Sequence, residues 1–90
     1  MNKDELKVKI ADFAYREKIC VPQAQVLDRL VDEEYDVEPA LAGCIDGFSK
    51  IEKMVEYIKS GNKEGIQMLI AQQEDEDQFM QDYFPDLIVH

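Results

Sequence analysis

Hydrophobic residues recur at helical spacing in four stretches of the chain, so the pattern predicts an all-α fold. The first two helices are expected near residues 3–18 and 22–35. Asn2, three positions before Glu5, fits a helix N-cap, and Pro22 suits a first helical turn. The apolar faces of these two helices are Leu6, Ile10, Phe13 and Ala14, and then Val26, Leu27, Leu30 and Val31. No stretch alternates with period two for long enough to predict a strand.

The longest periodic pattern covers residues 39–60 and predicts one long helix there, continuous or kinked. Its apolar positions alternate spacings of three and four: Leu41, Cys44, Phe48, Ile51, Val55 and Ile58. Against continuity, Gly43 and Gly47 weaken a helix interior, and Ser49 with Glu52 could begin a new helix. If this seam is buried, Phe48→Ala should cost ~3–5 kcal/mol. The alternative is that the 41–58 seam packs against a second copy in a homodimer.

A fourth helix is expected near residues 63–83. Gly61 suits the left-handed position that ends the preceding helix, and Asn62 can cap the new one. Its apolar face fails at seven consecutive polar residues, 72–78, and Pro85 ends the helix. We therefore expect a single domain, residues 1–90, built as a small bundle of about four helices with a short C-terminal tail.

Charge divides the chain unevenly, which changes what the total of −10 implies. Residues 1–31 carry six bases and five acids, whereas residues 32–90 carry four bases and fifteen acids. Such acidity disfavours direct binding to nucleic acid or to anionic membranes, because both depend on Lys and Arg. No uncharged run has the length of a signal peptide core or a membrane span, so we expect a cytoplasmic protein without a membrane partner.

The residues that usually carry chemistry are scarce, so we expect no enzyme, no catalytic residue, no metal and no cofactor. The single histidine, His90, is the last residue of the sequence, which leaves no His-based triad on a rigid element. Four consecutive acids point in different directions on a helix and lack the EF-hand spacing. Cys20 and Cys44 lie among apolar residues, and we expect buried free thiols rather than a disulfide.

Residues 10–31 resemble a helix-turn-helix motif, with a small residue in the first helix, a tight turn and apolar anchors in the second. The position usually held by glycine is Lys18, which departs from the motif. As an alternative function, this unit could regulate transcription by contacting DNA through Gln23, Gln25 and Arg29. Packing alone, or docking on protein, would give the same pattern.

The C-terminal segment, residues 74–90, combines acids with aromatic and aliphatic residues. It predicts an interaction region in which charge steers encounter with a basic protein surface and aromatic residues anchor it. The candidate partner-binding residues are Glu74, Asp75, Glu76, Asp77, Phe79, Asp82, Tyr83, Phe84 and Asp86. The competing interpretation is that the apolar members of this segment close the core.

Our leading hypothesis is therefore a non-enzymatic adaptor or inhibitor that binds a protein with a basic surface, such as a nucleic-acid-binding enzyme or a transcription or replication factor. By analogy of composition alone, its size and charge would suit a phage-encoded regulator or an immunity protein. A third hypothesis is an acidic subunit of a larger assembly.

Overall fold

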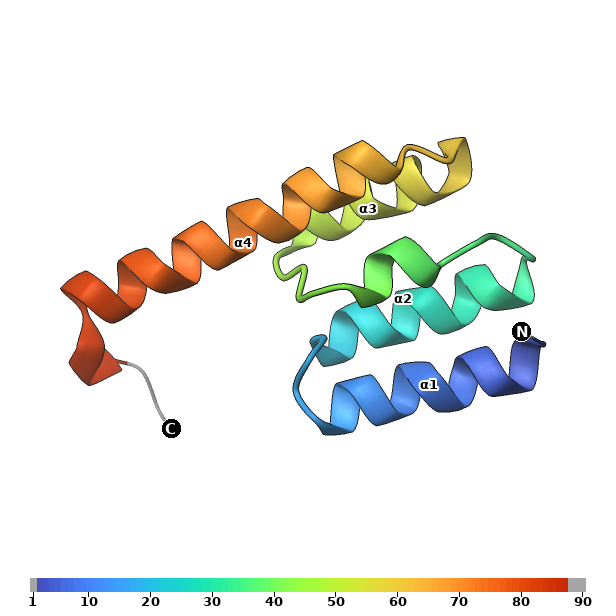
Figure 1. The fold of residues 1–90 in the computed structure, drawn as a ribbon, viewed down its shortest axis with the longest axis horizontal. Helices are drawn as coiled ribbons and strands as arrows, with labels where there is room; N and C mark the ends of the chain where they lie inside the picture. The colour runs from blue at the N-terminus through green and yellow to red at the C-terminus, as the bar shows by residue number, and fades with distance from the viewer. Residues whose placement is uncertain (1, 88–90) are drawn as a thin grey trace.

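The computed structural model describes residues 2–87, which form four α-helices and two short 3-10 helices and no strand (Figure 1). The all-α prediction is therefore confirmed. The last three residues of the 74–90 segment, which include His90, lie outside the described residues. None of the described helices is both long enough and apolar enough to cross a membrane.

Helices α1 (Lys3–Tyr15) and α2 (Val21–Asp32) form an antiparallel hairpin (Figure 1). The predicted cap of α1 is confirmed, because the Asn2 side chain accepts a hydrogen bond from the Glu5 N–H at 2.8 Å. Helix α1 ends three residues earlier than expected, and the chain turns through Glu17 at a φ of 60°. Helix α2 likewise ends before residue 35, where Glu34 has a φ of 70°. Left-handed residues cannot continue a right-handed helix, so they set both boundaries.

Helices α3 (Phe48–Ser60) and α4 (Lys63–Tyr83) form the second hairpin. Its tight connection is the predicted one. Gly61 ends α3 at a φ of 71°, and the Asn62 side chain caps α4 by accepting from the Gly65 N–H at 2.9 Å. A 3-10 helix η1 (Glu38–Leu41) joins the two hairpins, and η2 (Pro85–Leu87) follows α4.

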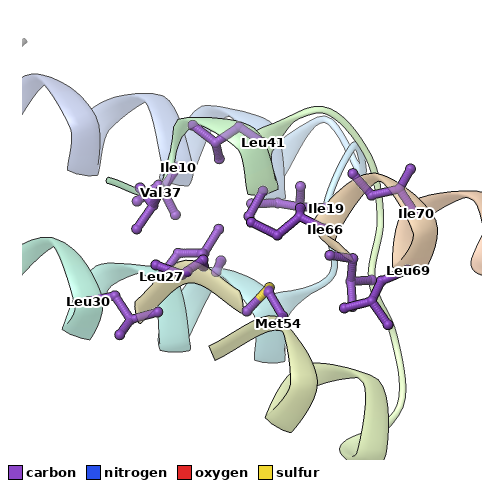
Figure 2. Close-up of a cluster of buried hydrophobic side chains, with 14 of the residues drawn as sticks. Ile10, Ile19, Leu27, Leu30, Val37, Leu41, Met54, Ile66, Leu69 and Ile70 are labelled. Carbon is purple, nitrogen blue, oxygen red and sulfur yellow. The ribbon is translucent and has the colours of Figure 1, made fainter. Parts of the chain in front are cut away.

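One core lies between the hairpins and η1, and each of these elements contributes fully buried side chains (Figure 2). Ile10 comes from α1, Leu27 from α2 and Met54 from α3, and all three have no exposed surface. Ile66, Leu69 and Ile70 of α4 close one end of this core, as their helical spacing predicted. Only the first half of α4 takes part in it.

The predicted continuous helix over residues 39–60 is wrong. Residues 42–47 form a loop between η1 and α3, and Gly47 has a φ of 104°, a conformation that favours glycine. A new helix does begin here, as the alternative allowed, but α3 starts at Phe48 with Gly47 as its N-cap, one residue before Ser49. Because the apolar seam is divided among η1, a loop and α3, residues 41–58 present no single helical face to a second copy.

Phe48 is not a core residue, contrary to the expectation from the seam. Its side chain is 82% exposed and stands beside a groove between α2 and α3, whereas Ile45 and Met54 are buried in its place. The three- and four-residue spacing of apolar positions continues across Gly47, but the backbone turns at this residue. Apolar residues on the two sides of Gly47 therefore do not lie on one helical face.

Phe48→Ala should therefore change the free energy of unfolding by less than about 0.5 kcal/mol, as for most exposed positions. The control is Ile58→Val, which deletes one buried methylene group and should cost about 1 kcal/mol. Urea denaturation of the two variants checks the order. A larger loss of unfolding free energy for Phe48→Ala than for Ile58→Val would show that the Phe48 ring is buried in the core.

Candidate functional site

Helix α4 consists of an inner half that packs on the core and an outer half that projects away from it (Figure 1). Its last buried residue is Gln73, and every residue from 74 to 86 is exposed. We call residues 74–86 the acidic tip. The seven polar residues that interrupted the apolar pattern thus mark the place where the helix leaves the bundle.

Four apolar side chains of the acidic tip are exposed, and one of them, Phe79, is in aromatic contact with two others. The ring centroids of Phe79 and Tyr83 are 4.6 Å apart, and those of Phe79 and Phe84 are 6.3 Å apart. Phe79 is 53% exposed and Tyr83 68%. Met80 is also exposed and lines a hollow with Phe79. Phe79, Met80 and Phe84 therefore do not close the core, and that competing interpretation is wrong for them.

Six acids and no base surround this aromatic cluster, and they lie on all sides of the helix. Glu76 forms an ion pair with Lys50, and Asp82 accepts a hydrogen bond from Gln78 at 2.9 Å. Within residues 2–87, Glu74, Asp75 and Asp86 take part in no ion pair. The structure thus brings the nine predicted residues together on one projecting segment.

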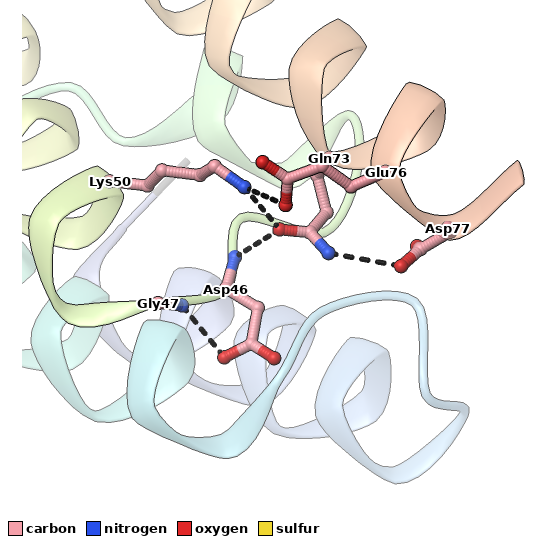
Figure 3. A network of polar contacts seen from close by, with 6 residues as sticks. All are labelled: Asp46, Gly47, Lys50, Gln73, Glu76 and Asp77. Atoms are coloured by element: carbon pink, nitrogen blue, oxygen red, sulfur yellow. Dashed lines mark hydrogen bonds and ion pairs between the residues drawn. The ribbon is translucent and has the colours of Figure 1, made fainter. Parts of the chain in front are cut away.

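A polar network fixes the base of the acidic tip to the loop before α3 (Figure 3). The Gln73 side-chain oxygen accepts from the Asp46 N–H at 3.3 Å and from the Lys50 ammonium at 3.1 Å. Its amide nitrogen donates to Asp77 at 3.0 Å, and Lys50 reaches on to Glu76. Because Gln73 is 8% exposed, these bonds satisfy a nearly buried amide and set the direction in which the tip leaves the bundle.

Sequence reasoning missed the parts that Gln73, Lys50 and Asp46 play here. Gln73 lay inside a polar run and looked like its neighbours, although its spacing from Ile66, Leu69 and Ile70 continues the inner face of α4. That spacing was the one available signal. The contacts of Lys50 and Asp46 depend on how α3 packs against α4, which the sequence pattern does not specify.

Elsewhere, the acids of residues 32–38 are largely compensated by lysines of α1. Lys7 forms an ion pair with Asp32 at 2.7 Å, and this hydrogen bond raises the pKa of Lys7. Lys3 pairs with Glu34 at 3.4 Å, and Lys9 pairs with Glu38 at 3.1 Å. Surface pairs of this kind add little stability, but they lower the local charge. The strongest uncompensated negative charge among the described residues is therefore the acidic tip.

The residues predicted for DNA contact are only partly available. Gln25 and Arg29 are exposed on α2, but Gln23 has no exposed surface and cannot reach a ligand. Its amide instead bonds three backbone groups of the neighbouring loop, those of Ala40, Gly43 and Ile45. Assigning Gln23 to DNA contact is therefore wrong, because its periodicity places it on the buried face of α2.

Within residues 2–87, no three His, Cys, Asp or Glu side chains converge in a way that could hold a metal ion. Comparison of the chain with protein-family models, curated proteins and solved structures gives no match.

Proposed function

We propose that the protein is a non-enzymatic adaptor or inhibitor that binds a basic surface of a partner protein through the acidic tip. The observation that carries this proposal is the exposure of Phe79, Met80, Tyr83 and Phe84 on a projecting segment, residues 74–86, that contains six acids and no base. Clustered apolar side chains rimmed by charge are typical of interaction surfaces. A nucleic-acid-binding enzyme or a transcription or replication factor has the complementary positive charge.

The two kinds of side chain have separate roles in this proposal. The acids attract a basic surface over a distance of about 8 Å at physiological salt, which raises the association rate. The aromatic cluster gives affinity, because large rings that are desolvated at the centre of an interface are common hot spots. The hydrogen bonds of Gln73 and Lys50 hold the base of the acidic tip, so that the acids and the aromatic cluster are presented in one orientation. This lowers the conformational entropy that is lost on binding.

The test is capture of a partner from lysate by the whole chain, followed by its identification and a titration with the purified partner. Phe79→Ala should weaken this binding about 30-fold, the effect of a hot spot near 2 kcal/mol. Met68→Ala is the matched control, because Met68 lies on the same helix and is 56% exposed but is outside the tip. Equal affinities of the two variants would contradict the aromatic anchor.

The charge component has its own test. Neutralising Glu74, Asp75 and Asp77 to their amides should slow association and weaken its dependence on salt. Neutralising the exposed acids Glu52, Glu56 and Glu64 to Gln is the matched control and should change neither. Salt-independent association of the unmodified chain would contradict steering by the tip. A shift of duplex DNA at low salt that Arg29→Ala abolishes would support the helix-turn-helix hypothesis instead.

A further inference from the structure

The two cysteines line the same hollow, although they come from different parts of the fold. Cys20 is the N-cap residue of α2, and Cys44 lies in the loop between η1 and α3. The hollow is bordered by Tyr15, Glu17 and Val21, and both cysteines are free and partly exposed. A small molecule in solvent can therefore reach both thiols from one side.

The contacts of the two thiols show that they are close. The Cys20 thiol donates to the backbone oxygen of Ile45, the residue after Cys44, at 3.2 Å. Burial, with a smaller contribution from the neighbouring Cys20, raises the pKa of Cys44 to about 11. Cys44 is consequently protonated at neutral pH.

We propose that Cys20 and Cys44 form a redox-active dithiol site that takes a small-molecule disulfide as its oxidant. One cysteine thiolate attacks a sulfur of the small disulfide, which forms a mixed disulfide and releases one small thiol. The second cysteine thiolate then attacks the protein sulfur of the mixed disulfide and releases the other small thiol. Overall, the protein loses two electrons and two protons, and the small disulfide is reduced to two thiols.

The bond would connect the loop between η1 and α3 to the first hairpin. Residues 42–47 carry the buried Ile45 and the Asp46 N–H that bonds Gln73 of α4. A link from Cys44 to Cys20 would tie this loop to the start of α2 and would restrict the unfolded chain between residues 20 and 44. The site uses no residue of the acidic tip, so it goes beyond the proposed function and stands independently of it.

The test is incubation of the whole reduced chain at low concentration with oxidised glutathione, followed by intact-mass measurement and gel electrophoresis without reductant. We expect a monomer that has lost two hydrogens in mass and carries no glutathione. Its Tm should rise by roughly 10–20 °C and return when the bond is reduced. The single variants Cys20→Ser and Cys44→Ser should each hold one glutathione and show no such rise.

A second measurement tests whether the fold brings Cys20 and Cys44 together, or whether they meet only by chance as they would in an unfolded chain. The ratio of protein disulfide to reduced thiol, at fixed glutathione composition, should be roughly 100-fold higher in buffer than in concentrated urea. Two glutathione adducts on the folded chain, crosslinks only between molecules, or an equal ratio in urea would each overturn the proposal. These readouts require no partner, so their failure leaves the proposed function standing.

Discussion

Replacing Gln23 by leucine should destabilise the protein by about 3–5 kcal/mol, because leucine keeps most of the volume and removes every hydrogen bond. The Gln23 amide donates to the Ala40 oxygen at 2.8 Å and to the Gly43 oxygen at 3.1 Å, and it accepts from the Ile45 N–H at 2.9 Å. After the substitution, these backbone groups would remain next to apolar surface without a partner. Chemical denaturation monitored by circular dichroism measures the loss.

The matched control is Gln25→Leu, on the same helix and exposed to solvent. Both variants replace glutamine by leucine within α2, so the change in intrinsic helix propensity is the same. The difference in their stabilities therefore reports burial and hydrogen bonding. Gln25→Leu should lie within about 0.5 kcal/mol of the unmodified chain. If the two variants were equally stable, the loop that contains residues 42–47 would not depend on Gln23.

Gly43→Ala should destabilise the protein by about 1–3 kcal/mol, because the added methyl group overpacks the contact between the loop and α4. A Cβ at this position would lie 2.5 Å from the Cγ2 atom of Ile70, which is 7% exposed. A Cβ atom essentially never approaches a non-bonded carbon so closely, so the loop or α4 would have to move. Thermal and urea unfolding both report this change.

A double-mutant cycle tests the cause of that loss. Ile70→Ala removes the atom in conflict and, by itself, should cost about 2–4 kcal/mol through the cavity it leaves. Combined with Gly43→Ala, it should cost at least about 1 kcal/mol less than the two single losses together. Strict additivity would show that Gly43 is not pressed against Ile70.

The local signals in the sequence predicted the parts of the fold that depend on neighbouring residues. The caps at Asn2 and Asn62 and the stop at Gly61 are confirmed, since each involves groups within a few positions of one another. The acidic tip was also recognisable, because its acids and aromatic rings are consecutive. The exposure of its apolar residues could not be predicted, since the same residues could have packed on the core.

The errors arose where distant residues decide the conformation. The apolar period through residues 39–60 favours an α-helix, but the buried amide of Gln23 bonds the backbone of residues 40–45, which is a 3-10 helix followed by a loop. The spacing of Gln23 from Leu27 and Leu30 already indicates a position on the buried face of α2, so its assignment to DNA contact could have been avoided. Its bonds to the loop, by contrast, depend on how α2 and the loop lie side by side, which the sequence pattern does not specify.

The two halves of α4 are under different constraints, because only the inner half packs on the core. Substitutions of the buried residues before Gln73 act on the core, whereas residues 74–86 are all exposed and have mostly exposed polar contacts. The outer half can accordingly diverge rapidly in charge and aromatic content while the bundle persists. Related chains would then share the helical scaffold and differ in the outer half of α4, with Gln73 at the boundary between the constrained and the variable sequence.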